Sequence, residues 1–178
     1  MDKPNNASIW HRHFGDMARY HVWAIHRLLE AVSRVPAADY QCDVGLFFKS
    51  IHGTLNHMLV AEHLLWYARF AKGTSPVLAL DTEVEPHRER LAQALKGGSA
   101  NWTPLISSWT AERFDGHLDY RTSKGDPLSL PFAVTLAHVF NHATHHRGQI
   151  TSALTAMGQP CPELDIVYFL LAEQATKA

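Results

Sequence analysis

A long uninterrupted helical pattern occupies residues 131–157. Apolar residues recur through it every three to four positions, as they do on one face of an α-helix that turns about 100° per residue. The apolar face consists of Phe132, Leu136, Val139, Ala143, Ile150, Leu154 and Met157. A long helix with one apolar face is stable in water only when that face packs against other helices. This segment therefore favours a helical bundle.

Further segments with helical periodicity precede and follow this one. We expect Ser8 to cap the first of them, Pro36 to end it, and Gly158 to follow the end of the long one. The glycine pair at 97–98 weakens another, which is predicted to be one kinked helix or two shorter ones. The predicted ranges are 8–35, 44–72, 85–109 and a short closing helix at 163–173.

The stretch 118–130 breaks the helical pattern. Turn residues at 124–127 separate two short extended segments, so a small irregular hairpin is predicted before the last long helix. With 178 residues the chain is long enough for one full core, and we interpret residues 1–178 as a single domain. The predicted fold class is all-α: a four-helix bundle with one long crossover connection.

Composition excludes several classes of function. Formal net charge is -1, so the chain has no basic surface for nucleic acid or for an anionic membrane. No stretch is apolar for long enough to span a bilayer, and no secretory signal is visible. Cys42 and Cys161 lie far apart and form no CxxC motif, which suits a reducing compartment. We expect a cytoplasmic location.

Histidine is the one residue type in clear excess, with 13 in the chain. Four of them, His138, His142, His145 and His146, lie in the long helical segment. Imidazole is a common ligand for Zn, Ni, Cu and Fe, and helical residues four apart project from the same side. His146 falls within the apolar face and His142 at its edge, whereas His138 and His145 lie further round. The pair at 142 and 146 can hold one metal ion.

A third histidine is expected from the segment 44–72. His57 points to a side made of small and apolar residues, which leaves room for its ring and for something bound to it. His52 and His63 share the opposite side with Lys49 and Asn56, and we interpret that side as facing solvent. A hydrogen-bonded core histidine is the plain alternative for His57, and a surface pair is the plain alternative for the other two.

Three histidine ligands would leave at least one coordination position open. This is the pattern of catalytic zinc sites, whereas structural sites are closed by four protein ligands. The sequence therefore predicts a metal centre at His57, His142 and His146. It identifies no general base. On an α-helix Glu62 would face Leu55 and Met58 instead of the side of His57, and we interpret it as a salt-bridge partner before a base. Glu62 and His145 are the next candidates, for orienting the ligand rings.

The first predicted helix carries YHVWA at 20–24, and the second carries LNHMLVAE at 55–62 with Trp66 following. The segment 141–150 reads NHATHHRGQI, and ELD follows at 163–165. In these motifs the chain resembles the DinB/YfiT-like family of small four-helix metalloproteins. The segment 141–150 is the most specific of them, and the resemblance extends over nearly the whole chain. In this sequence His21 and His26 replace asparagines that are usual in the opening motif.

The resemblance implies a function that the spacing of residues does not. It places the family's three metal ligands on His57, His142 and His146, with Zn or Ni as the ion. It also implies a homodimer and a small-molecule substrate. The expected function is that of a metal-dependent enzyme, either a thiol-dependent S-transferase that uses a low-molecular-weight thiol or a hydrolase-like enzyme. The alternative is a non-catalytic, stress-related protein whose metal stabilises the fold. A DNA-binding repair role has no support in the charge.

Overall fold

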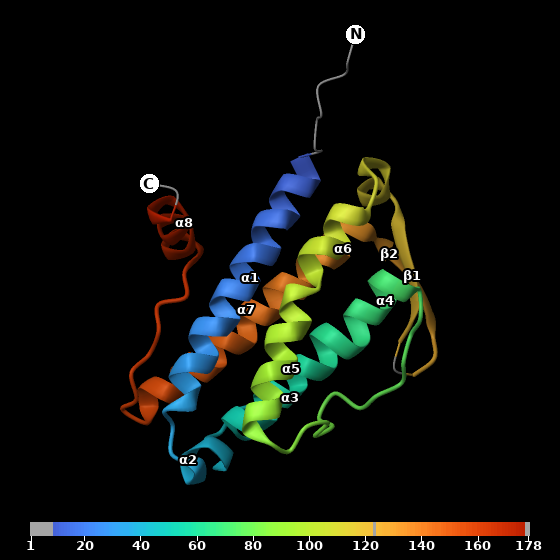
Figure 1. Cartoon of the computed structure of the whole chain (residues 1–178). Helices are drawn as coiled ribbons and strands as arrows, with labels where there is room; N and C mark the ends of the chain where they lie inside the picture. Colours follow the sequence, from blue (N-terminus) through green and yellow to red (C-terminus); the bar gives the residue numbers. More distant parts are fainter. Residues whose placement is uncertain (1–8, 123, 177–178) are drawn as a thin grey trace.

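The computed structural model describes residues 9–122 and 124–176, and it confirms the predicted four-helix bundle with a small hairpin before the last long helix (Figure 1). Its four long parts are α1, a second helix made of α3, the π-helix η1 and α4, a third made of α5 and α6, and α7. Their bounds are Ile9–Ser33 for α1, Ile51–Met58 for α3, Leu59–Trp66 for η1, Tyr67–Lys72 for α4, Arg88–Ala100 for α5, Trp102–Ser108 for α6 and Phe132–Ala156 for α7. Ser8, the predicted cap of the first helix, lies outside the described residues.

The connection 73–87 is the long crossover of the bundle (Figure 1). It begins at Gly73, whose left-handed φ of 62° ends α4, and it runs back along the molecule to the start of α5. The second and third helices consequently run in the same direction, and α1 and α7 run in the opposite direction. The crossover thereby passes two histidines of the second helix: its Leu80 carbonyl lies 2.8 Å from Nδ1 of His57, and its Glu83 carboxyl lies 3.3 Å from Nε2 of His52.

The second helix begins later than its sequence pattern suggests. It was expected from Val44, but α3 starts at Ile51, where the Ser50 hydroxyl accepts a hydrogen bond from the backbone N–H of Gly53. Residues 43–50 form a compact loop instead, in which Lys49 adopts a left-handed φ of 67°. A short helix that was not predicted, α2 (Ala37–Gln41), precedes this loop.

The middle of the second helix is a π-helix. In η1 the backbone N–H groups bond five residues back instead of four, as the Tyr67 N–H does to the Glu62 carbonyl. This geometry brings residues five apart towards one side of the helix, whereas an α-helix separates them. As a result Glu62 lies on the same side of the helix as His57, where an α-helical projection would have turned it away.

The third helix is two helices, one of the two forms left open by the sequence. The glycine pair does not cause the break, because it lies inside α5 and the chain bends only after Ala100. Gly98 has a packing function: a Cβ built on it would lie 2.5 Å from Cγ of the His63 ring. Gly97 points to open space, with nothing within 4 Å of its Cβ position. Gly98 thus provides the room for the imidazole of His63.

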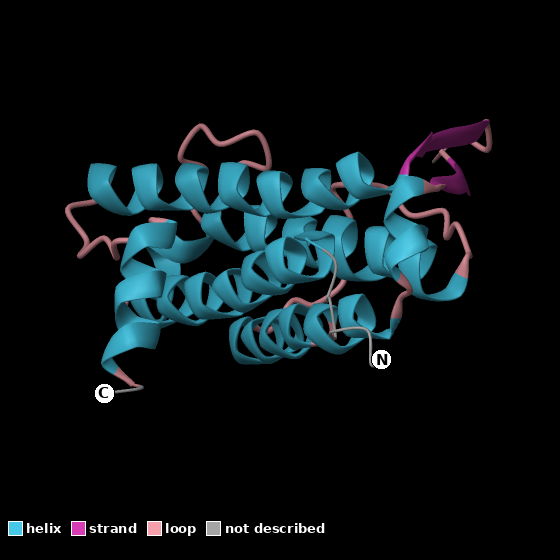
Figure 2. Ribbon diagram, turned by 90° about the horizontal axis from the view of Figure 1, so that it is seen from above, coloured by secondary structure: helices cyan, strands magenta, loops and turns pink. Residues whose placement is uncertain are grey.

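The remaining elements lie at one end of the bundle and beside α1 (Figure 1). The 3-10 helix η2 (Ala111–Asp115) leads into the hairpin of β1 (His117–Arg121) and β2 (Pro127–Pro131), which are antiparallel with Leu118 opposite Leu130. The hairpin projects from one end of the bundle (Figure 2). Gly158, with φ of 68°, follows the end of α7 as predicted, and α8 (Ile166–Ala175) lies against α1 through Phe169. In the described ranges no helix has the length and hydropathy needed to cross a membrane.

The packing of Gly98 against His63 gives the first prediction. We expect Gly98→Ala to lower the free energy of unfolding by about 1–3 kcal/mol, because the new methyl group overlaps the imidazole. Gly97→Ala is the matched control on the same helix and should be neutral or stabilising by up to about 1 kcal/mol. Urea unfolding followed by circular dichroism measures both.

A double-mutant cycle with His63→Ala tests whether overlap with His63 causes the loss of stability. In that background the Gly98→Ala change should cost clearly less, because the atom that it overlaps has been removed. An undiminished cost would show that the methyl group disturbs something other than His63.

Candidate metal centre

Three histidines from two helices meet inside the bundle, and they are the three that the sequence selected. The Nε2 atom of His142 lies 3.0 Å from Nε2 of His57 and 3.1 Å from Nε2 of His146. His57 comes from α3, and the other two occupy successive turns of α7. The three ligand atoms lie within 4.8 Å of one another, so the cluster could hold a metal ion.

The other nitrogen of each ring has a partner that accepts a hydrogen bond. Nδ1 of His57 lies 2.8 Å from the carbonyl oxygen of Leu80, Nδ1 of His146 lies 2.8 Å from Oε1 of Gln149, and Nδ1 of His142 lies 3.3 Å from Oε1 of Glu62. An oxygen of these kinds accepts, so each Nδ1 carries the proton and donates. In a neutral imidazole the remaining nitrogen, Nε2, then presents a lone pair.

Three lone pairs therefore face one another at close range. With every proton on Nδ1, the short contacts between Nε2 atoms have no hydrogen to share, and the nitrogens repel. A cation placed between them removes this repulsion, and the residues present fit a divalent metal: three neutral imidazoles, each held through its second nitrogen. This arrangement is typical of histidine metal sites.

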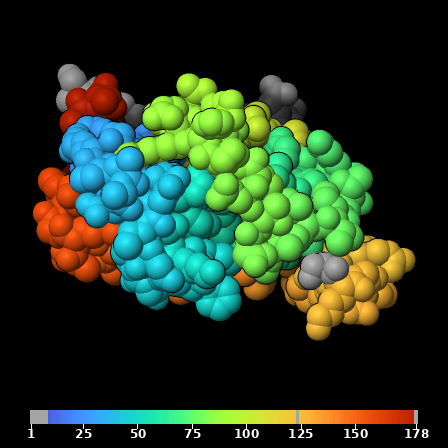
Figure 3. Space-filling model, turned by 90° about the horizontal axis from the view of Figure 1, so that it is seen from below, coloured from blue at the N-terminus to red at the C-terminus, as the bar shows by residue number. Residues whose placement is uncertain are grey.

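The surroundings of His57 fix its ring. The Phe48 side chain, from the loop before α3, stacks on the imidazole with ring centres 3.8 Å apart and planes at 15°. The side-chain oxygen of Asn56 accepts hydrogen bonds from the backbone N–H groups of Val84 and Glu85, both at 3.0 Å, which anchors the crossover. The anchored crossover then supplies the Leu80 carbonyl. Figure 3 shows the loop and the crossover side by side on this face.

Burial keeps the ligand rings neutral. It lowers the pKa of His57 to about 4, although the hydrogen bond to the Leu80 backbone opposes the shift. It also lowers the pKa of His146 to about 3, with the neighbouring His142 adding to the effect. Neutral imidazole is the form that binds metal. These two ligand rings are therefore neutral over the physiological pH range, with the proton on Nδ1 and the lone pair on Nε2.

Glu62 joins this centre to a second buried group. Its carboxyl is fully buried, and burial raises its pKa while the hydrogen bond with His142 opposes the rise. Its second oxygen, Oε2, lies 3.6 Å from Nε2 of His21 and 3.9 Å from Nε2 of His63. The predicted orienting role of Glu62 thus has a geometric basis, whereas its expected position on the other side of the helix is wrong because of the π-helix.

The prediction that His52 and His63 face solvent is also wrong. His52 is 4% exposed and lies 3.0 Å from the Tyr40 hydroxyl, because α2 covers this side of α3. His63 is 9% exposed because α5 covers it at Gly98. A projection of this one helix could not show either contact, since α2 and α5 are separate elements that pack on it from outside.

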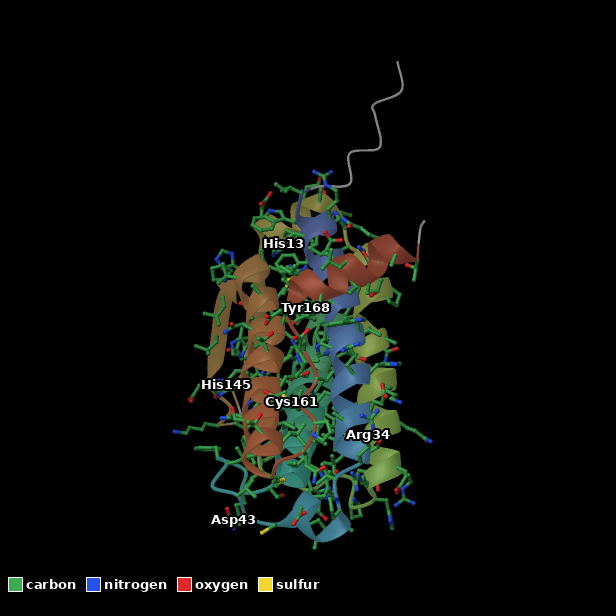
Figure 4. All side chains as sticks on the ribbon, turned by 90° about the vertical axis from the view of Figure 1, so that its left-hand side faces the viewer. His13, Arg34, Asp43, His145, Cys161 and Tyr168 are labelled. Atoms are coloured by element: carbon green, nitrogen blue, oxygen red, sulfur yellow. The ribbon has the colours of Figure 1, made fainter. Side chains whose placement is uncertain are left out.

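The two other histidines of α7 lie outside the cluster. His145 is exposed on the outer side of the helix (Figure 4) and contacts the Gln149 side-chain nitrogen at 3.2 Å. His138 is also exposed, with its ring centre 5.8 Å from that of His142 and 5.3 Å from that of Trp66. His138 therefore lies beside the cluster, on the side of the hairpin.

A model of the DinB family matches residues 1–177. The chain belongs to the DinB family. Protein DinB of Bacillus subtilis strain 168 is 25% identical over 165 residues, covering 89% of this chain and 94% of that protein. YfiT of Bacillus subtilis, described as a probable metal-dependent hydrolase with an unusual four-helix bundle topology, matches with a TM-score of 0.65. That match covers 90% of this chain and 95% of YfiT at 12% identity, and it shows the shared fold.

The neutral burial of His63 predicts a dependence of stability on pH. Burial lowers its pKa from 6.5 to about 4. The unfolded chain therefore binds this proton more readily than the folded protein does, and stability falls as pH decreases from about 6.5 to about 4. One such group contributes roughly 3 kcal/mol over that interval. We expect metal-free His63→Gln protein to lose less stability on acidification than the metal-free wild type.

Urea unfolding at a series of pH values measures this difference. His117→Gln, which removes an exposed histidine of β1, is the matched control and should keep the wild-type slope. Equal slopes for wild type and His63→Gln would contradict the prediction.

Proposed function

We propose that this protein is a metal-dependent enzyme whose divalent ion, Zn²⁺ or Ni²⁺, is held by His57, His142 and His146. The observation that carries the proposal is the convergence of three ring nitrogens whose lone pairs have no proton between them. Membership of the DinB family and the fold shared with YfiT support it. Imidazole suits both metals, so the ligand set does not choose between them.

The ligand set favours catalysis over a purely structural role. Structural zinc sites are closed by four protein ligands, whereas catalytic sites keep a position for water or substrate. In the described part of the chain only three histidine, cysteine or carboxylate side chains belong to this cluster. The His142 side chain is 15% exposed, so the cluster is accessible from outside.

A divalent ion bound there supplies Lewis acidity and favours the deprotonated form of a coordinating water or thiol near neutral pH. The protein's own groups prepare the site. Glu62, Leu80 and Gln149 hold the three rings through Nδ1. Phe48 covers one face of His57 and keeps water from it.

A hollow beside His138 offers a place for the substrate. Its volume of about 340 Å³ lies in the range of small-molecule sites, about 300–1,000 Å³. Its walls are mostly apolar and come from the hairpin, η1 and the first turns of α7. They consist of Trp66, Tyr120, Leu130, Pro131, Val134, Thr135 and His138. We infer that the apolar part of the substrate binds here, with the hairpin forming part of the rim.

The reaction we propose is nucleophilic attack on an electrophilic substrate, by water in a hydrolase or by a low-molecular-weight thiol in an S-transferase. The description of YfiT as a probable metal-dependent hydrolase favours the first. The thiol, the homodimer and the cytoplasmic location stay predictions. The alternative function, a metal that only stabilises the fold, makes a different prediction about the metal-free protein.

Metal content tests the ligand set. We expect His142→Ala to lower the metal bound per chain at least tenfold, because outer ligand partners alone are worth about 10–100-fold in affinity and His142 is central to the cluster. Elemental analysis after dialysis against a fixed concentration of Zn²⁺ measures it. His145→Ala is the matched control on the same helix and should keep the wild-type content. Stoichiometric metal in His142→Ala protein would remove His142 from the site.

Removal of the metal separates the enzyme from the structural protein. For an enzyme we expect the chelated protein to remain helical at 25 °C but to lose turnover of a panel of activated esters and of electrophiles offered with a small thiol. Zn²⁺ or Ni²⁺ should restore the activity. If the helical signal collapses on chelation and no substrate of the panel turns over with metal, the structural alternative is correct.

A further inference from the structure

A buried polar group lies behind the metal centre, where α1, η1 and α7 meet. Its members are His21 of α1, Glu62 and His63 of η1, and Arg147 of α7, with exposed fractions of 1%, 0%, 9% and 2%. Nε2 of His21, Oε2 of Glu62 and both ring nitrogens of His63 have no hydrogen-bond partner within normal distance. Such atoms are costly to bury, so their arrangement calls for an explanation.

The direction of the hydrogen bonds in this group can be derived from Arg147. Its guanidinium nitrogen lies 3.2 Å from Nδ1 of His21. A guanidinium only donates, so Nδ1 of His21 must accept. Burial and the charge of Arg147 lower the pKa of His21 well below its ordinary value, so the ring is neutral. A neutral ring that accepts at Nδ1 carries its proton on Nε2.

The protonated Nε2 of His21 faces Glu62. It lies 3.6 Å from Oε2 of the carboxyl, which is too far for a hydrogen bond, so the two groups interact through the N–H dipole alone, in a buried site where such an interaction is weakly screened. A second guanidinium nitrogen of Arg147 donates to the Thr144 hydroxyl at 2.8 Å and ties Arg147 to its own helix. The dipole of His21 therefore acts on Oε2, and the other oxygen of the carboxyl, Oε1, is left to accept from Nδ1 of His142.

A metal ion in this second group is the competing interpretation. One ligand atom each from His21, Glu62 and His63 lie within 4.8 Å of one another, as in the first cluster. A metal would need the lone pair of His21 at Nε2, where the contact with Arg147 places a proton. It would also lie close to a buried guanidinium of the same charge sign. The geometry thus favours a series of polar contacts, from Arg147 through His21 and Glu62 to His142, over a second metal site.

We propose that His21 and Arg147 are positioning residues of the metal centre. Neither touches the three ligands, but Arg147 fixes the proton of His21, the dipole of His21 acts on Glu62, and Glu62 keeps the proton of His142 on Nδ1. The lone pair of His142 then faces the metal. The rings of His57 and His146 are oriented by Leu80 and Gln149 instead, so the contacts from Arg147 through His21 and Glu62 orient His142 alone. The inference rests on the proposed function, since it assumes a metal at the three histidines.

Two variants of His21 test this series of contacts through the affinity of the protein for metal. His21→Phe removes both ring nitrogens at similar size, and His21→Gln keeps one acceptor and one donor. We expect His21→Phe to raise the Kd for Zn²⁺ about tenfold, the lower end of the effect of groups that orient metal ligands. His21→Gln should stay within about twofold of wild type. Competition with a chromophoric chelator measures the Kd, and thermal melts establish that each variant is folded.

Ring-nitrogen NMR gives a readout that needs no variant. In metal-free wild type we expect the proton of His21 on Nε2 and the proton of His142 on Nδ1. In His21→Phe the His142 signals should shift towards a mixture of both forms, while those of His57 and His146 stay unchanged. A proton on Nδ1 of His21 in wild type would contradict the proposed positioning role, and this result does not require His21→Phe to fold.

The outcomes separate the two proposals. If wild type and His142→Ala bind Zn²⁺ equally, the proposed function fails. If His142→Ala loses Zn²⁺ while folded His21→Phe binds it as tightly as wild type, only the proposed positioning role fails. If wild type binds two equivalents of Zn²⁺ and His21→Phe binds one, the group of His21, Glu62 and His63 is a metal site. That result would contradict the proposed positioning role.

Discussion

The structure around the candidate metal centre depends on one constraint: the Nε2 atoms of His57, His142 and His146 face one another with no proton between them. Mutual repulsion of their lone pairs would drive the rings apart if each were not held through its other nitrogen. The hydrogen-bond partners of the three rings come from different parts of the fold. Leu80 of the crossover binds His57, Glu62 of the π-helix binds His142, and Gln149 of the next turn of α7 binds His146. Packing of the bundle thus holds the three rings in a mutually repulsive arrangement, and a cation bound between them removes the repulsion.

The irregular parts of the fold serve this arrangement. The loop at 43–50 brings Phe48 onto His57, and the crossover at 73–87 is long because it must return along the bundle past the same ring. The π-helix turns Glu62 towards His142, and Gly98 makes space for His63 beside it. A regular four-helix bundle with short connections would lack each of these contacts. Such departures from regular geometry are common where a site has to be built.

Helical periodicity predicted the long helices of the bundle and the direction in which His57, His142 and His146 point, because each is a property of one helix. The hairpin was predicted from its turn residues. Periodicity failed for His52, His63 and Glu62. His52 is covered by α2 and His63 by α5, which are separate elements, and Glu62 was displaced by a π-helix that an α-helical projection does not contain. One signal for the buried group was present in the sequence, since His21 replaces an asparagine usual in the resembling family, but nothing in the sequence said what it contacts.

The sequence by itself determined which residues lie inward on each helix, since a fixed rotation per residue links spacing to direction. Only the tertiary structure decided which atoms of those residues meet. Whether a ring nitrogen donates or accepts depends on a carbonyl, an amide or a carboxyl brought to it by another segment. Those partners are set by how the helices, the crossover and the loop pack together, and no local pattern encodes that packing.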